Sequence, residues 1–191
     1  MNFLAHLYLA PDDDDALLGS LMGDFVKGPL RGEHAPGIER GLALHRRIDA
    51  FTDAHPVVAR SRARILPPRR RYAGIMVDMF YDHCLARDWA RYASLPLEQF
   101  ADRVYRLLEN QGSRLPERLR RMAPTMTRQD WLSSYREVRA IGCALERMGT
   151  RLKRGNALLG AGADLDVHYA GLGADFDEFF PQLITFARSS T

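Results

Sequence analysis

The spacing of its apolar residues is the feature that most limits how this chain can fold. In residues 38–55, Ile38, Leu42, Ile48 and Phe51 recur at spacings close to those of one helical face, the pattern typical of an amphipathic α-helix. Similar patterns follow one another along the chain, and no convincing run of alternating apolar and polar β-branched residues appears. The sequence therefore predicts an all-α fold.

Proline, glycine and acidic residues indicate where these helices begin and end. We expect helices over residues 2–10, about 12–28, 38–55, 57–66, 71–92, 97–111, 131–148 and 175–187. The glycine-rich residues 151–172 are expected to be irregular and able to loop back over a site. No linker divides the chain, and its length of 191 residues suits a single domain, 1–191.

Composition narrows the classes of protein that fit. Hydrophobic residues make up 46% and charged residues 27% of the chain, the proportions of a folded globular protein. Cys84 and Cys143 lack metal-type spacing, so we expect free thiols in a reducing compartment, the cytoplasm. The opening MNFLAHLYLA is too short and polar to span a membrane and lacks the features of a signal peptide.

Polar side chains stand where a buried helix ordinarily carries apolar ones. The stretch MVDMFYDHCLARDW places Asp78 and Asp82 four positions apart on one helical face, with His83 at its edge. His45 and Asp49 repeat the same spacing on the preceding long helix. Each pair is suited to gripping one ion.

Asp24, in the apolar LLGSLMGDFVKG, and His6, in FLAHLYL, add ligand types from two more segments. Buried carboxylates are costly unless they are paired or coordinated, and a divalent cation reverses their mutual repulsion. A mixed His and Asp shell without thiolates favours manganese, iron, zinc or magnesium. The sequence therefore indicates a divalent metal site.

Simpler interpretations compete with this one. A single histidine such as His6 or His168 on an apolar helix is more often a hydrogen-bonded core residue than a ligand. Asp53, and equally Asp49, can pair with an arginine such as Arg46 or Arg47. The arginine runs are more often solvated faces than sites.

Several long blocks of the sequence together resemble a known family. MNFLAHLYLA, LLGSLMGDFVKG, GLALHRRIDAFTDAHP, RRYAGIMVDMFYDHCLARDW and DLDVHYAGL occur in this order and are similar to the acyl carrier protein phosphodiesterases, also called acyl carrier protein hydrolases. The resemblance covers nearly the whole chain. It implies an all-helical fold related to HD-domain phosphohydrolases and a divalent metal, with manganese preferred.

The resemblance also implies a reaction: hydrolysis of the phosphodiester that joins 4′-phosphopantetheine to a serine of the carrier protein. The products are apo-carrier protein and free 4′-phosphopantetheine. The chain has no adjacent His-Asp dipeptide, only the reversed Asp82-His83, so the metal shell cannot be copied from HD enzymes. The residues in matching blocks that we predict as metal ligands or their supports are Asp24, His45, Asp49, Asp78, Asp82 and His83.

Roles for the remaining polar residues follow from what phosphodiester hydrolysis demands. His6 is predicted to act as general acid to the leaving group, and Lys27 or Arg46 to hold the phosphate. We expect Asp24, His45, Asp82 and His83 to lead the metal shell, with Asp49 and Asp78 as further ligands or supports of the histidines.

The formal charge of +3 and the pI of about 9.1 suit an anionic partner. Acyl carrier proteins are acidic, so Arg69, Arg70 and Arg71 are predicted to form a positive rim that attracts one. No nucleic acid or membrane partner is expected. Two rival functions stay open: a metal-dependent phosphohydrolase of a small phosphorylated or nucleotide substrate, and a non-enzymatic module that binds the carrier protein.

Overall fold

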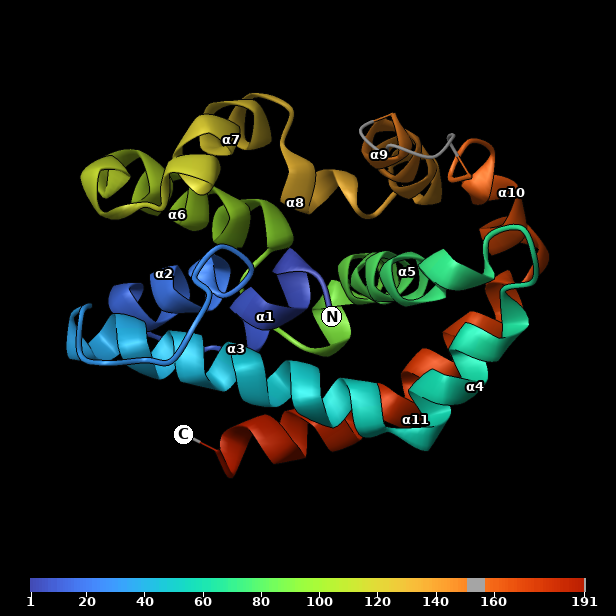
Figure 1. Cartoon of the computed structure of the whole chain (residues 1–191), viewed down its shortest axis with the longest axis horizontal. Helices are drawn as coiled ribbons and strands as arrows, with labels where there is room; N and C mark the ends of the chain where they lie inside the picture. The colour runs from blue at the N-terminus through green and yellow to red at the C-terminus, as the bar shows by residue number, and fades with distance from the viewer. Residues whose placement is uncertain (151–156, 191) are drawn as a thin grey trace.

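The computed structural model describes residues 1–150 and 157–190 (Figure 1). This part of the chain contains α-helices and short 3-10 helices and no strand, so the all-α prediction is confirmed. The helices are α1 (Phe3–Leu9), α2 (Asp14–Met22), α3 (Pro36–Ala54), α4 (Pro56–Arg64), α5 (Ala73–Arg87), α6 (Leu97–Asn110), α7 (Glu117–Arg128), α8 (Trp131–Ser134), α9 (Val138–Gly149), α10 (Ala161–Val167) and α11 (Tyr169–Arg188).

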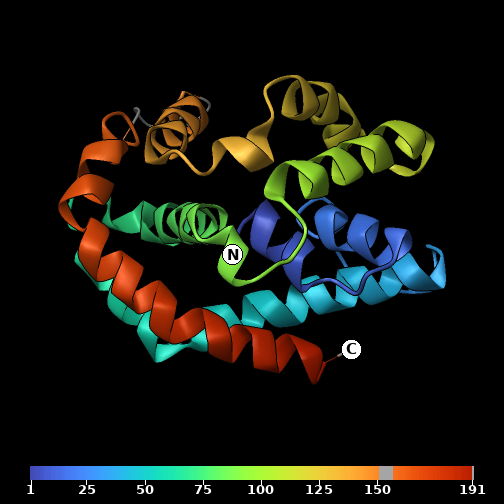
Figure 2. The same cartoon turned by 180° about the vertical axis from the view of Figure 1, so that it is seen from behind.

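The helices form layers around a central pair, α1 and α5. On one side α3, α4 and α11 cover this pair, and on the other lie α6 to α9 (Figure 1). Seen from behind, α11 runs along both α3 and α4 (Figure 2). Buried apolar side chains from nearly all of these helices make one contiguous core. Within the described residues, no helix has the length and apolar character needed to cross a membrane.

Helices α2 and α3 approach each other more closely than side chains allow. A Cβ atom at Gly19 would lie 2.1 Å from the carbonyl oxygen of Ile38, and one at Gly41 would lie 2.2 Å from that of Ala16. Only glycine permits such contact between backbones. The crossing brings Ser20 of α2 against the middle of α3.

Helix α2 ends earlier than the sequence predicted. It stops at Met22, whose carbonyl accepts from the backbone N–H groups of Phe25 and Val26. The expected continuation to residue 28 is therefore wrong. Asp24 lies on a tight turn after the helix, where its side chain is not confined to a helical face.

Other boundaries also differ from prediction. Helix α7 was not predicted, although Leu119, Ala123 and Met126 mark its buried face. The predicted helix 131–148 is divided into α8 and α9. Part of the segment expected to be irregular, residues 157–172, forms α10 and the start of α11, while residues 151–156 lie outside the described residues.

A buried carboxylate joins α4 to α11. Asp175, 2% exposed, accepts hydrogen bonds from Arg60 at 2.7 Å, from Arg64 at 2.9 Å and from the Ser61 hydroxyl at 2.7 Å. The Tyr81 hydroxyl lies 2.8 Å from that of Ser61. Burial by itself raises the pKa of Asp175, but these donors outweigh it and hold the pKa below its ordinary value. The carboxylate is fully partnered and fixes the two helices together.

Candidate metal centre

Two histidines and one aspartate converge between α1 and α3. Nε2 of His6 lies 3.1 Å from Oδ1 of Asp49, and Nε2 of His45 lies 3.2 Å from Oδ2 of the same carboxylate. The imidazole rings are stacked, with centroids 3.7 Å apart and planes 14° from parallel. Among the described residues, this trio is the one group whose potential ligand atoms all lie within 4.8 Å of one another.

A turn of α2 fixes both histidines. Nδ1 of His45 donates to the carbonyl of Ser20 at 2.8 Å, and the hydroxyl of Ser20 donates to the carbonyl of His6 at 2.8 Å. Gly23 lies against the His45 ring, where a Cβ atom would come within 2.2 Å of Cγ. The sequence analysis missed Ser20 and Gly23. For Gly23, the glycine next to the candidate ligand Asp24 was a usable signal.

The donor set suits a divalent metal. Nδ1 of His45 carries the proton donated to Ser20, so Nε2 is the nitrogen directed toward the carboxylates. Nε2 becomes a ligand once its own proton is displaced, the arrangement typical of metal-bound histidine. Both ring nitrogens of His6 are buried, and Nε2 pairs with Oδ1 of Asp49 at 3.1 Å. Burial lowers the pKa of His6 to about 4, so this ring is neutral near pH 7 and able to act as a ligand.

Asp24 is a second carboxylate near His45, in addition to Asp49. Its Oδ1 lies 3.8 Å from Nε2 of His45, and its side chain is about half exposed. Burial by itself lowers the pKa of His45, but Asp24 and Asp49 raise it to about 9. Burial by itself raises the pKa of Asp49, but hydrogen bonds from the two histidines outweigh it and hold this pKa far below its usual range. In the metal-free protein, the imidazolium proton of His45 offsets part of the negative charge.

Asp78 lies near the same cluster, because the amine of Met1 pairs with both Asp78 and Asp49. The α-amino nitrogen of Met1 lies 3.4 Å from Oδ1 of Asp78 and 3.6 Å from Oδ1 of Asp49. Burial raises the pKa of the Asp78 carboxyl. The structure therefore brings five predicted site residues near one another: His6, Asp24, His45, Asp49 and Asp78.

Asp82 binds the start of α1 and is not part of the trio. Its oxygens accept the backbone N–H groups of Leu4 at 2.7 Å and Ala5 at 3.1 Å, at the N-terminus of α1. Burial raises its pKa to about 7 despite these donors. Both oxygens are engaged in anchoring the helix that carries His6, so Asp82 supports the cluster from outside the trio.

His83 points away from the cluster. Its Nδ1 donates to the carbonyl of Tyr135 at 2.8 Å, and its Nε2 lies 2.8 Å from the hydroxyl of Tyr169, which also accepts from Arg87. Neighbouring residues on a helix diverge by about 100°, and in this structure Asp82 binds the start of α1 while His83 binds Tyr135 and Tyr169. The structure does not bring the predicted ligand His83 to the trio.

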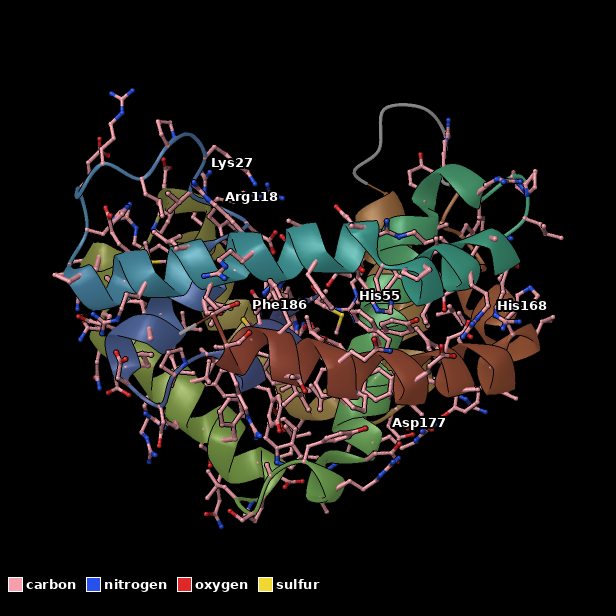
Figure 3. The ribbon with its side chains drawn as sticks, turned by 90° about the horizontal axis from the view of Figure 1, so that it is seen from below. Lys27, His55, Arg118, His168, Asp177 and Phe186 are labelled. Carbon is pink, nitrogen blue, oxygen red and sulfur yellow. The ribbon has the colours of Figure 1, made fainter. Side chains whose placement is uncertain are left out.

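The three residues predicted for acid catalysis and phosphate binding are differently placed. His6 is 1% exposed, and a neutral imidazole in that position suits a ligand better than a general acid. Arg46 donates to the carbonyl of Val26 at 3.1 Å and so braces the turn that carries Asp24. Lys27 is exposed on the loop after that turn and is labelled in Figure 3. The guanidinium of Arg118 lies over the ring of Phe25 in the same turn.

A cavity of about 750 Å³ opens beside the cluster. Its lining residues are Met1, Asn2, Asp24, Asp53, Ala59, Arg62, Ala63, Arg70, Ala73, Gly74, Ile75 and Asp78. Of the predicted arginine rim, Arg70 faces this cavity. Arg69 instead pairs with Asp164 at 3.0 Å and donates to the carbonyl of Leu159 at 2.7 Å, while Arg71 lies over the Tyr72 ring.

Comparison with known proteins gives one consistent result. The family model described as acyl carrier protein phosphodiesterase matches residues 1–183. The chain is 36% identical over 190 residues to the protein of that name from Pectobacterium atrosepticum, covering 99% of this chain and 98% of the relative. It is 37% identical to the protein of that name from Klebsiella pneumoniae, covering 99% of this chain and 98% of the relative. It is 35% identical to that from Escherichia coli O157:H7, covering 98% of this chain and 97% of the relative.

No solved structure matches this chain. The relation to HD-domain phosphohydrolases therefore stays a prediction.

Proposed function

The chain belongs to the acyl carrier protein phosphodiesterase family, and on that basis we propose that it is a metal-dependent phosphodiesterase acting on holo-acyl carrier protein. The reaction breaks the bond between phosphorus and the serine oxygen of the carrier. Water supplies the new oxygen on phosphorus, and the serine oxygen takes up a proton. The products are apo-carrier protein and 4′-phosphopantetheine.

The convergence of His6, His45 and Asp49 supports the metal requirement more than any other observation. Two nitrogens and a carboxylate around one point, with Asp24 3.8 Å from His45, match the borderline ligands of manganese, iron and zinc. We take Mn²⁺ as the first candidate and Mg²⁺, Fe²⁺ and Zn²⁺ as alternatives. When bound, such an ion supplies an activated water and neutralises charge on the phosphoryl oxygens.

The remaining residues position this centre. Ser20 holds both histidines, and Asp82 anchors the first turn of α1. Asp24 and Asp49 are 48% and 41% exposed, so their outer faces are open to solvent and to a substrate. Against the effect of burial, His45 holds the pKa of Asp24 below its ordinary value, so this carboxylate is ionised and is placed to orient the attacking water and accept its proton.

An acidic protein substrate agrees with the charges near the cavity mouth. Arg70 and Arg71 are exposed at the start of α5, and complementary charge raises the rate at which protein partners meet. Arg69 is already held by Asp164 and anchors the loop that carries its neighbours. We assign the attraction of the carrier to Arg70 and Arg71.

Mass spectrometry of the carrier protein tests this proposal. Purified chain is incubated with holo-acyl carrier protein and Mn²⁺, with and without a chelator. Loss of the 4′-phosphopantetheine mass only in the absence of chelator is the expected result. An unchanged carrier, with Mn²⁺ shown to be bound, would exclude this substrate and favour a small phosphorylated one.

A further inference from the structure

We propose that Arg62 and Arg70 form a phosphate-binding wall in the cavity beside the metal centre, and that the apolar residues around them hold the pantetheine arm. This inference rests on the proposed function, because it names how the same substrate is bound. It uses residues that the sequence analysis did not assign to the phosphate.

Groups of opposite charge line this cavity. Asp24 and Asp78, which border the trio, line it together with Arg62 and Arg70. The charge of Arg62 reaches Asp78, whose carboxyl pKa it lowers against the larger effect of burial. A phosphodiester bound in the cavity can therefore meet the metal centre and a guanidinium group at the same time.

Arg62 retains binding capacity for an anion. Its Nη2 pairs with Asp53 at 2.6 Å, but Asp53 is 68% exposed and so forms a weak, screened pair. Its Nε is buried and has no hydrogen-bond partner. A phosphate can compete with Asp53 for the terminal N–H donors of Arg62, because guanidinium groups bind phosphate through paired N–H donors.

Arg70 is presented to the cavity by its neighbour. Arg69 is held by Asp164 and by the carbonyl of Leu159, which fixes the loop before α5. Arg70 then begins a 3-10 helix with its side chain exposed. Within the described residues, no carboxylate forms an ion pair with Arg70.

The rest of the wall is apolar and shallow. Ala59 and Ala63, four positions apart on α4, line one side, and Gly74 and Ile75 of α5 line another. Ile75 is 38% exposed and so offers an apolar surface to the cavity. Small residues beside one exposed aliphatic side chain leave room for an extended chain of amides and methyl groups, and the cavity volume lies within the usual range for such ligands.

Calorimetric titration tests the wall without depending on turnover. The full chain, with chelator present, is titrated with 4′-phosphopantetheine and with pantetheine, which lacks the phosphate. Arg70→Ala should weaken binding of 4′-phosphopantetheine about tenfold or more and leave pantetheine unchanged. Arg120→Ala is the control, because it removes the same charge from an exposed residue of α7 that does not line the cavity, and it should change neither affinity appreciably.

Two further variants test the phosphate contact and the contact with the pantetheine arm separately. Asp53→Asn frees Arg62 and should tighten 4′-phosphopantetheine binding by up to about fivefold. Ile75→Ser should weaken both ligands by a similar factor, because it removes a contact with the arm and none with the phosphate. Both positions are exposed enough for the fold to tolerate the change.

The outcomes separate this inference from the proposed function. Equal effects of Arg70→Ala and Arg120→Ala, or equal weakening of both ligands by Arg70→Ala, would overturn the phosphate wall even if the wild type cleaves holo-carrier. If the wild type does not cleave the carrier but binds 4′-phosphopantetheine in an Arg70-dependent manner, the wall stands and the proposed reaction fails.

Discussion

The Asp175 cluster and the His6–His45–Asp49 trio both place carboxylates among apolar helices, yet the groups that neutralise the carboxylate charge differ between them. Asp175 is 2% exposed and accepts from two guanidinium groups and a serine hydroxyl. Asp49 instead faces two imidazoles and the Met1 amine, and near it Asp24 and Asp78 add further negative charge. Oδ1 of Asp78 is buried and pairs with the Met1 amine at 3.4 Å.

The difference separates a structural carboxylate from a functional one. A buried charge whose donors are all supplied by the chain stabilises the fold, whereas a surplus of ligand atoms is costly unless a cation is added. Removing groups from the first cluster should reduce stability and spare activity. Removing groups from the second should abolish activity and spare stability.

The largest effect is expected for His45→Ala. Removal of a ligand should reduce kcat/KM by more than about 100-fold, since even loss of a residue that only supports a ligand costs 10–100-fold. The variant should also lose Mn²⁺ measured by elemental analysis, while its melting temperature in chelator stays close to that of the wild type. Full metal content with full activity would remove His45 from the site.

Gly23→Ala should have the next largest effect. The new methyl group would lie 2.2 Å from Cγ of His45, so the ring must move, and a displacement of about 1 Å can cost about 100-fold in rate. Gly173→Ala is the control, because a Cβ there meets nothing within 4 Å. A Gly23→Ala enzyme with the kinetics of the control would show that the ring has freedom to relax.

Asp175→Asn should act on stability alone. Arg60 and Arg64 lose their shared carboxylate, and we expect a loss of roughly 1–3 kcal/mol in the free energy of unfolding, discounted because both guanidinium groups are partly exposed. Urea denaturation measures this loss. Below the unfolding temperature kcat/KM should match the wild type, and a large loss of activity there would mean that α4 and α11 also shape the site.

The same carboxylate predicts a pH dependence. The pKa of Asp175 is lower in the folded protein than in the unfolded chain, so its stabilisation is present above the unfolded value of about 3.9 and is lost as pH falls through the folded pKa. The difference in melting temperature between wild type and Asp175→Asn should therefore shrink as pH falls below about 4. A difference that stays constant to pH 2 would contradict the assigned ion pairs.

His83→Gln should have the smallest effect on the metal centre. The ring is occupied by Tyr135 and Tyr169, so Mn²⁺ content should not change and kcat/KM should stay within about threefold, with a stability loss of about 1 kcal/mol. Loss of bound Mn²⁺ would restore the original prediction that His83 is a ligand.

The sequence by itself determined the helical class, the family and the residue types of the site. Apolar periodicity is a local property, so it was sufficient to predict most helices, and Leu119, Ala123 and Met126 show that α7 was predictable in the same way. The four-residue spacing of His45 and Asp49 likewise predicted a shared face. Their side chains do converge, with Nε2 3.2 Å from Oδ2.

The tertiary structure alone decided which of the candidates meet. Asp82 and His83 are adjacent in sequence, but the helical turn sends one to the N-terminus of α1 and the other to Tyr135 and Tyr169. His6 gained its place from the approach of α2 and α3 through Gly19 and Gly41, which brings Ser20 between the two histidines. Spacing within one helix fixes a face, whereas the contact between helices fixes what that face meets.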